Sequence, residues 1–426
     1  MNKILIKNVN LISMDEKRNK IENEVDILIE NDKIVKIGKN INSEAIIIDG
    51  TDKYLLPGLV NTHCHIPMSL FKETVDGLPL QTWLEESIWP KEAKLTREDI
   101  YYASLLAFIE MIKTGTTTVN DHYFFQDEII DASKKIGIHL IETRCLMDSD
   151  DNGEKRYQEL LTFLDKYQPN EQLDLSIGIH GLYTNSEEYV KKLTSLAKEK
   201  NLLVHMHFCE DENEVQTIKN NYQVDNPTEV LEKYFKNLKC VLAHCVKLTD
   251  KDIEIMKKLN VGVAHCPVTN LKLGSGIANI TKLKNNNILV GLGTDGPGSG
   301  SNFDMFQVMR FAALIQKGIH ENSMLMNSYD VLKMATIDGA KVLGLDGKIG
   351  SIEVGKQANL ILLSLDNIMT QPKNDIIANI VYNANQNNVE KVIINGNIIL
   401  SDNKINNINE YEIINKCEEI TKRLFN

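Results

Sequence analysis

The sequence lacks several features that mark other classes of protein. No stretch of about 18 apolar residues could span a membrane, and the opening stretch, MNKILIKNVNLISMD, has neither a signal-peptide core nor a cleavage site. The seven cysteines form no CxxC pair, which argues against a disulfide framework and a thiolate zinc knuckle. Basic residues are not in excess, since 47 Lys and Arg stand against 59 Asp and Glu. We therefore expect a cytoplasmic protein that binds neither a membrane nor a nucleic acid.

The apolar residues that are present, 42% of 426, suffice for one large domain and a smaller one. Both ends of the chain carry short alternating segments, such as VDILIE near the start and VEKVIING near the end, which are typical of antiparallel strands. We predict that residues 1–56 and 347–426 together build one small β-sandwich. The closing stretch, 408–425, has helical spacing and is expected to lie on the outside.

Between these ends, strands alternate with helical segments, a pattern that predicts a parallel sheet. Helical spacing occurs in segments such as 98–113, 186–200 and 250–259. The apolar runs of residues 57–346 are, in order, GLVNTH, TTTVND, HLIETR, LSIGIH, LLVHMH, CVLAH, VGVAH and ILVGLGTD. Eight strands with eight crossovers predict a (β/α)8 TIM barrel, whose active site lies at the carboxyl ends of the strands.

Each of these runs ends in a polar or ionisable residue, and the residue types favour a metal site. His63 and His65 are one residue apart, so they point the same way from one strand end. An HxH pair alone is as often two packed core histidines, but His207 and Asp295 supply further nitrogen and oxygen ligands at other strand ends. We predict one zinc-like divalent ion, held by His63, His65, His207 and Asp295.

Three residues are candidates for proton transfer. Glu210, in HMHFCE, lies just past a strand end, where it can carry protons without binding the metal. A loop glutamate is more often simply solvated, but attack of water on a ring carbon requires a group that protonates a ring nitrogen. His244 would orient the water, and Asp295 would accept its proton. His205 lies deeper in its strand and is expected to pack, while His265, which precedes a Cys-Pro turn, is left outside the site.

The motifs NTHCHIP, HMHFCE, LAHC, HCPVTNLKLGSG and GLGTDG extend over much of the chain. Together with the flanking β segments, they resemble those of the 5'-methylthioadenosine/S-adenosylhomocysteine deaminases of the amidohydrolase superfamily. The resemblance implies a mononuclear zinc or iron site and hydrolytic deamination of an adenine base. No lysine ends the fourth strand, so the chain does not resemble the dinuclear branch that uses a carboxylated lysine.

The resemblance also implies a substrate pocket. Glu92, in WPKEAKLT, would hold the ribose hydroxyls, and Trp83 would form an aromatic wall. His180 would contact the base, with Glu210 and Asp295 at the reacting end. From the residues alone, Glu92 and Trp83 could equally start and pack a helix.

Two arginines complete the pocket that the resemblance implies. Arg144 and Arg156 would meet the amino-acid carboxylate of S-adenosylhomocysteine, which a guanidinium can bind through two hydrogen bonds. Arg156 could instead be a plain surface charge, whereas Arg144 lies at a strand end. Two departures from the family pattern, GLYTNS after the fourth strand and His122 after Asp121, leave the substrate preference open.

Two other kinds of function stay open. Another hydrolase on the same barrel, acting on adenosine, 5'-deoxyadenosine, guanine, cytosine or a triazine, would keep the metal ligands but need other recognition groups. A catalytically silent barrel with a role in assembly would be expected to have lost ligands. The complete ligand set argues against the silent barrel, and Glu92 with Arg144 and Arg156 favours deamination of S-adenosylhomocysteine and 5'-methylthioadenosine, without ranking these substrates. We also expect the enzyme to be a homo-oligomer.

Overall fold

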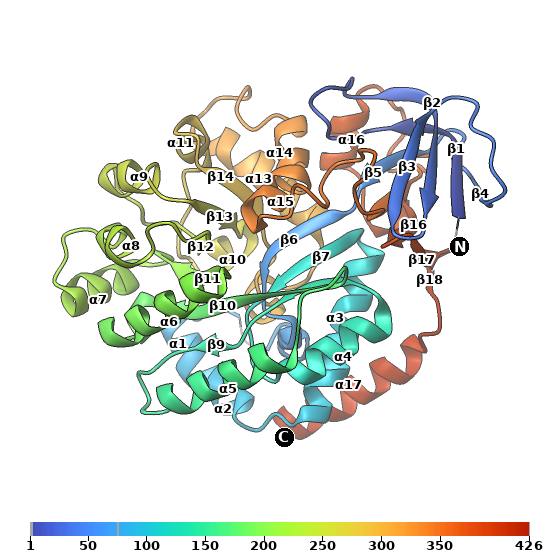
Figure 1. The fold of residues 1–426 in the computed structure, drawn as a ribbon. Coiled ribbons are helices and arrows are strands. Elements are labelled where there is room, and N and C mark those ends of the chain that lie inside the picture. Colours follow the sequence, from blue (N-terminus) through green and yellow to red (C-terminus); the bar gives the residue numbers. More distant parts are fainter. Residues whose placement is uncertain (1–2, 75, 426) are drawn as a thin grey trace.

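The computed structural model describes residues 3–74 and 76–425. The middle of the chain forms parallel strands that curl into a barrel (Figure 1). The strands pair in the order β6, β7, β8, β10, β11, β12, β13, β14. The short β9 also pairs in parallel with β10. Their bounds are β6 (Leu59–Cys64), β7 (Thr116–Asp121), β8 (His139–Glu142), β9 (Cys145–Leu146), β10 (Leu173–Gly181), β11 (Leu203–Phe208), β12 (Cys240–His244), β13 (Val261–His265) and β14 (Leu289–Leu292).

The first and last barrel strands, β6 and β14, are joined by hydrogen bonds outside a regular ladder. The amide of Asp295 donates to the carbonyl of His63 (3.1 Å), and the hydroxyl of Thr62 donates to the carbonyl of Leu292 (2.9 Å). Gly291 allows this approach, because a Cβ there would lie 2.6 Å from Thr62 Cγ2. Closure of the barrel therefore brings two predicted metal ligands together.

Helices cover the outside of the barrel (Figure 1), which explains why strands such as β12 and β13 are apolar up to their last residue. The helices predicted from residues 98–113, 186–200 and 250–259 are confirmed as α3, α6 and α9. The larger barrel helices are α3 (Arg97–Lys113), α4 (Gln126–Ile136), α5 (Gly153–Lys166), α6 (Glu187–Lys200), α7 (Glu212–Tyr222), α8 (Thr228–Tyr234), α9 (Asp250–Met256), α13 (Met305–Ile319), α14 (Ser328–Met334) and α15 (Ile337–Leu343). Shorter helical segments are η1 (Ile66–Phe71), α1 (Leu80–Thr82), η2 (Trp83–Ile88), α2 (Trp89–Glu92), η3 (Leu182–Thr184), α10 (Pro267–Lys272), α11 (Ile280–Asn285), α12 (Pro297–Gly300) and η4 (Gln386–Asn388).

The two ends of the chain share one mixed sheet beside the barrel (Figure 1). Its strands are β1 (Lys3–Leu11), β2 (Glu22–Glu30), β3 (Lys33–Gly38), β4 (Ile46–Asp49), β5 (Tyr54–Pro57), β15 (Leu360–Leu363), β16 (Val389–Ile394), β17 (Asn397–Ser401) and β18 (Lys404–Ile405). The two ends meet where β5 pairs antiparallel with β15, with Leu55 opposite Leu362. Ile4, Ile27 and Leu360 belong to one apolar cluster with these two residues. The predicted fold, a (β/α)8 barrel with a small β domain formed from both chain termini, is confirmed, and the strands of the predicted β-sandwich pair in one mixed sheet, called the β unit below. The exact boundaries at 56/57 and 346/347 stay predictions.

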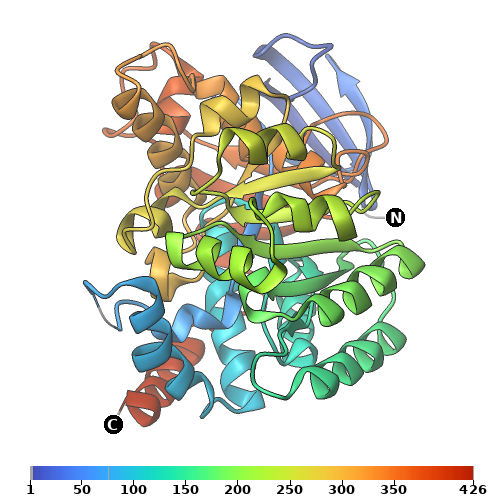
Figure 2. The ribbon, with the colours of Figure 1, turned by 90° about the vertical axis from the view of Figure 1, so that its left-hand side faces the viewer.

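Two C-terminal helices connect this β unit to the barrel through polar contacts with barrel helices. On α16 (Ile376–Tyr382), the carbonyl of Tyr382 accepts a hydrogen bond from Arg310 Nε of α13 (2.7 Å). The helix α17 (Glu410–Phe425) lies along α3, where Lys113 Nζ is 2.6 Å from Glu410 Oε2 (Figures 1 and 2). The closing helix predicted from the sequence is therefore confirmed. Within residues 3–74 and 76–425, no helix combines the length and the hydropathy that a membrane span requires.

Candidate metal centre and active site

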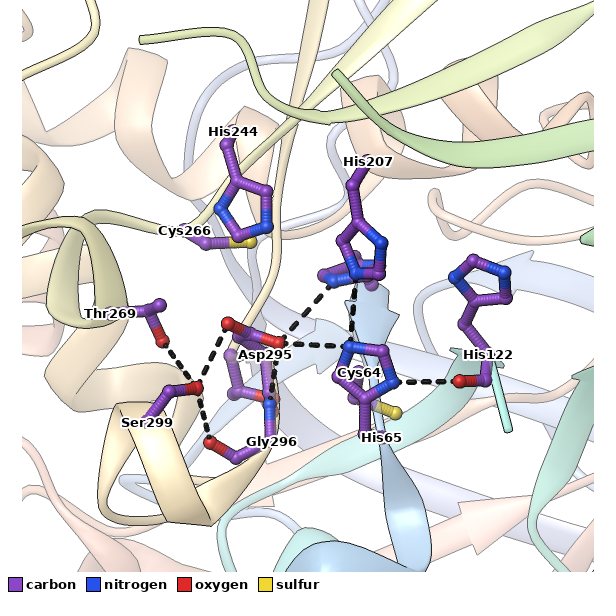
Figure 3. Close-up of polar contacts among 12 residues, drawn as sticks. Cys64, His65, His122, His207, His244, Cys266, Thr269, Asp295, Gly296 and Ser299 are labelled. Carbon is purple, nitrogen blue, oxygen red and sulfur yellow. Dashed lines mark hydrogen bonds and ion pairs between the residues drawn. The ribbon is translucent and has the colours of Figure 1, made fainter. Parts of the chain in front are cut away.

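The four predicted metal ligands lie together at the carboxyl end of the barrel, with His63 on β6, His65 directly after it, His207 on β11 and Asp295 after β14. Figure 3 shows His65, His207 and Asp295 directed toward one another. His65 Nε2 is 3.1 Å from His207 Nε2 and 3.2 Å from Asp295 Oδ1. His63 Nε2 is 3.4 Å from Asp295 Oδ1, and the His63 ring centroid is 5.0 Å from that of His207. The side chains thus direct nitrogen and oxygen atoms at one region of space.

Backbone carbonyls fix the orientation of two of these rings. His65 Nδ1 donates to the carbonyl of His122 (2.7 Å), and His207 Nδ1 donates to the carbonyl of His180 (2.6 Å). In the neutral form of each ring the proton is on Nδ1, so Nε2 carries the lone pair that a metal ion requires. Two lone pairs 3.1 Å apart repel each other unless a proton or a cation lies near them.

The charges of the ligand cluster favour the binding of a cation. Burial alone would lower the pKa of His65, but the carboxylate of Asp295 raises that pKa to about 9. His63 Nε2 is fully buried and has no hydrogen-bond partner among the described residues, while its Nδ1 lies 2.8 Å from His205 Nε2. His205 therefore contacts the ring nitrogen of His63 that faces away from Asp295, in agreement with the packing role expected for it. A buried site that stabilises positive charge, with nitrogen and carboxylate ligands, suits a zinc-like divalent ion.

Asp295 is held in place by the segment that follows it. Its φ of +60° lies in the left-handed region, and Oδ1 accepts a hydrogen bond from the amide of Gly296 (2.7 Å). Oδ2 accepts from the hydroxyl of Ser299 (3.0 Å), which also lies 3.3 Å from Thr269 Oγ1 (Figure 3). Burial acts to raise the pKa of Asp295, but the imidazoles of His63 and His65, 3.4 and 3.2 Å from Oδ1, hold that pKa well below its ordinary value. The carboxylate is therefore ionised and directed at the ligand cluster.

Glu210 is a buried carboxylic acid beside the ligand cluster. Its Oε2 is 3.6 Å from His244 Nε2, and its Oε1 has no hydrogen-bond partner within the described part of the chain. Burial, with the negative charge of Asp295, raises the pKa of Glu210 well above its ordinary value. Both oxygens of Glu214 accept from the backbone of this loop, one from the amide of Cys209 (2.8 Å) and one from that of Glu210 (2.7 Å). Glu210 is thus positioned to hold and release a proton.

His244 faces the same space from the end of β12. Its Nδ1 donates to Asn270 Oδ1 (2.9 Å), which leaves Nε2 directed toward Glu210. His265 is buried at the end of β13 and does not line the cavity. The supporting residues Glu214, Asn270 and Ser299 were not predicted from the sequence. Only Glu214 has a local signal, because an acidic residue three positions after the N-cap Asp211 often binds backbone amides.

One cavity of about 580 Å³ opens over the ligand cluster, a size typical of small-molecule sites. Side chains from several barrel loops surround it, and the apolar share of the wall comes from residues such as Leu84, Trp89, Phe124 and Phe125. All the residues predicted to bind substrate also line it, namely Trp83, Glu92, Arg144, Arg156, His180, Glu210 and Asp295. The cavity therefore combines the ligand cluster with the predicted recognition groups.

Glu92 and Trp83 reach the cavity from short helices after η1. Trp83 is 5% exposed at the start of η2, and Glu92 ends α2. The Tyr123 hydroxyl donates a hydrogen bond to Glu92 Oε1, and burial raises the pKa of Glu92. Tyr123, which was not predicted, therefore orients this carboxyl group inside the cavity.

Both predicted arginines are already paired with acidic side chains of this chain. Arg144 donates from Nε to Glu159 Oε2 (2.9 Å) and from Nη1 to the carbonyl of Cys145 (2.7 Å). Arg156 donates from Nη1 and Nη2 to the two oxygens of Asp150 (2.5 and 2.6 Å). The Arg156 side chain is only 13% exposed, so it is not a freely solvated surface charge.

The two departures noted in the sequence both reach the cavity. The segment GLYTNS forms η3, where the Tyr183 ring lies 5.6 Å from the His180 ring and lines the cavity. His122 is buried, and within residues 3–74 and 76–425 neither of its ring nitrogens has a hydrogen-bond partner. Its ring centroid lies 5.1 Å from that of His207. Both side chains therefore shape the space in which a substrate would lie.

Comparison with known proteins assigns the chain to a family. The sequence model described as "Amidohydrolase family" matches residues 54–399. A 5-methylthioadenosine/S-adenosylhomocysteine deaminase from Caldanaerobacter subterraneus subsp. tengcongensis is 37% identical over 99% of this chain and 98% of its own. A 5'-deoxyadenosine deaminase from Methanocaldococcus jannaschii is 40% identical over 93% of this chain and 95% of its own. The structure of an adenosine deaminase from Xanthomonas campestris with bound zinc has a TM-score of 0.93 and 29% identity, over 99% of this chain and 98% of that chain. The chain thus belongs to the amidohydrolase family.

Proposed function

We propose that the protein is a metal-dependent aminohydrolase that removes the amino group from the adenine base of 5'-substituted adenosines. S-Adenosylhomocysteine and 5'-methylthioadenosine are the substrates inferred, and water converts each to its inosine derivative and ammonia. One observation carries the proposal: a single cavity joins a cluster of histidines and a carboxylate to a buried carboxylic acid and to recognition groups beyond it. The names of relatives that match nearly the whole chain support the same reaction.

The ligands proposed for the metal are His63, His65, His207 and Asp295. One Zn²⁺ ion suits this set, because three imidazoles and a carboxylate are ligands that zinc prefers and that leave room for water. When bound, such an ion supplies water of lowered pKa for hydrolysis near neutral pH.

Three residues are proposed to move the protons of the reaction. Glu210, whose pKa is raised by burial, donates a proton to the ring nitrogen next to the carbon that water attacks. Asp295 accepts a proton from the water, and His244, oriented by Asn270, hydrogen-bonds that water. The proton held by Asp295 is then passed to the departing amino group, which leaves as ammonia. The second proton of the water returns to Glu210 as the carbonyl of the product forms.

The remaining lining residues are proposed to hold the nucleoside. Glu92 accepts hydrogen bonds from the ribose hydroxyls, Trp83 packs against the nucleoside, and His180 contacts the base. Arg144 and Arg156 lie where a charged 5' substituent would be recognised. These roles use the residues that line the cavity and require no change in the fold.

The test is a direct assay on the purified protein. Loss of adenine absorbance with 5'-methylthioadenosine and S-adenosylhomocysteine, together with about one metal ion per chain by elemental analysis, is expected. Turnover of guanine, cytosine or a triazine with no turnover of any adenosine would contradict the proposal. A metal-loaded protein that acts on none of these compounds would instead support the silent barrel.

A further inference from the structure

We propose that Asp150 is a specificity-determining residue. Its carboxylate occupies the face of Arg156 that would bind a substrate carboxylate, and it thereby favours adenosines whose 5' substituent carries no negative charge. The inference rests on the proposed function, because it concerns which 5' substituents the same cavity accepts.

The pair of Asp150 and Arg156 has the geometry of a carboxylate-binding site that is already filled. Asp150 lies in the loop before α5, and Arg156 lies near the start of that helix. Two bonds of 2.5 and 2.6 Å join the two carboxylate oxygens to Nη1 and Nη2, the two-pronged arrangement in which a guanidinium binds a carboxylate. Nη1 also donates to the carbonyl of Met147 (2.9 Å). The Arg156 guanidinium holds the pKa of Asp150 well below its ordinary range, so the pair is ionised at neutral pH.

The second arginine of the cavity is neutralised in the same way. Arg144 donates from Nε to Glu159 Oε2 at 2.9 Å. Arg144, Arg156 and Asp150 all line the cavity, and Glu159 accepts the bond from Arg144 without lining the cavity itself. Two positive charges therefore meet two negative charges at this end of the cavity, and no excess positive charge is left to attract a carboxylate.

A substrate carboxylate must compete with one that belongs to the protein. Asp150 is tethered six residues from Arg156, so its effective concentration at the guanidinium is on the order of millimolar, well above micromolar substrate. The Asp150 side chain is 47% exposed, however, so water and salt screen the pair and its strength is modest. Asp150 should therefore reduce the use of charged substrates about five- to tenfold without abolishing it. An uncharged methylthio or methyl substituent does not have to displace Asp150 from Arg156, so its turnover is not reduced by this competition.

The amino-acid tail of S-adenosylhomocysteine carries an ammonium as well as a carboxylate, and the experiment must separate their effects. We would measure kcat/KM on the metal-loaded enzyme for three compounds. They are 5'-methylthioadenosine, S-adenosylhomocysteine, and 5'-(3-carboxypropylthio)adenosine, which has the carboxylate without the ammonium. The variants are Asp150→Asn and the matched control Asp151→Asn. The control removes the same negative charge from the adjacent residue, which does not line the cavity. Asp151 has a φ of +61°, which asparagine tolerates.

The readout is the ratio of kcat/KM for each charged compound to that for 5'-methylthioadenosine. For both charged compounds, this ratio should rise about five- to tenfold in Asp150→Asn and stay at the wild-type value in Asp151→Asn. Because the ratio compares compounds on one sample, partial unfolding of a variant does not change it. Wild-type enzyme that deaminates no adenosine would refute the proposed function, whereas all results below require that function to hold.

Four results would overturn the inference. An unchanged ratio in Asp150→Asn would show that Asp150 does not compete with the substrate. A fall for S-adenosylhomocysteine alone would show that Asp150 binds the ammonium. An equal rise in Asp151→Asn would show a general effect of charge. Loss of turnover of all three compounds in Asp150→Asn would show that Asp150 maintains the shape of the pocket.

Discussion

Replacement of Glu210 by glutamine tests the proton-transfer step most directly. The substitution keeps the size of the side chain and its hydrogen-bonding capacity but removes the proton that the carboxylic acid can donate. The contact between the loop and Glu214 uses the backbone amide of residue 210, so it survives the change. The metal ligands should also stay in place, because Glu210 contacts His244 and none of the four proposed ligands within hydrogen-bond distance.

The expected loss follows from what a positioned acid contributes. General acid catalysis contributes about two to four powers of ten in rate, which corresponds to about 3 to 5 kcal/mol of activation free energy. The upper part of this range is expected here, since Glu210 is only 7% exposed and bulk water cannot easily replace it as the donor. The loss should fall on kcat, because the proton is needed in the transition state and not for binding.

The assay follows adenine absorbance with 5'-methylthioadenosine, with metal content measured on the same sample. Glu210→Gln should keep the wild-type metal content while kcat falls by at least about a hundredfold. Loss of the metal together with activity would show that Glu210 is a ligand. A loss below about tenfold would show that another group donates the proton, and either result refutes the reasoning.

Three further changes test other parts of the site and the fold. His63→Ala should lose both the metal and the activity, and retention of one ion per chain in elemental analysis would contradict the ligand set. Glu92→Gln should lower kcat/KM about ten- to a hundredfold for 5'-methylthioadenosine and S-adenosylhomocysteine alike, but not for 2',3'-dideoxyadenosine, which lacks the hydroxyls. Asp26→Ala removes a buried carboxylate that accepts the amides of Asn8 (2.9 Å) and Ile41 (2.8 Å). It should lower the free energy of unfolding in urea by about 2 to 4 kcal/mol while kcat/KM is unchanged, and a change below about 1 kcal/mol would contradict this role.

The barrel could be predicted because its signals are local. Most barrel strands are rich in apolar residues and have a polar residue at or just past the carboxyl end, as in β12, where CVLAH is buried up to His244. The hydrogen bonds that close the barrel are not local, since Thr62 and Leu292 are 230 residues apart. No sequence periodicity shows that position 291 must be glycine so that Thr62 can approach it. The strand count was therefore accessible from the sequence, and the closure was not.

The residues that support the site were missed for a related reason. Asn270 and Ser299 are polar residues in the one-turn helices α10 and α12, a setting in which such residues commonly cap helix ends or face water. Their roles depend on partners elsewhere, since Asn270 binds a histidine 26 positions earlier in the chain. The acidic partners of Arg144 and Arg156 are 15 and 6 positions away, spacings that fall outside the helical pairs at three or four residues. Sequence alone suggested two free arginines, whereas the fold supplies each with a carboxylate.

The way the histidine rings are held explains how the cavity can change without loss of the ligand cluster. His65 and His207 are oriented by the carbonyls of residues 122 and 180, and a carbonyl is present whatever side chain the residue carries. The side chains of those same two residues line the cavity. A substitution there changes the surface that a substrate contacts, while the bonds that fix the two rings are retained. The unusual His122 should therefore affect substrate preference and leave metal binding intact. Accordingly, His122→Ala should retain the full metal content while changing the ratio of kcat/KM between two adenosines, and loss of the metal would show that the ring itself supports the ligands.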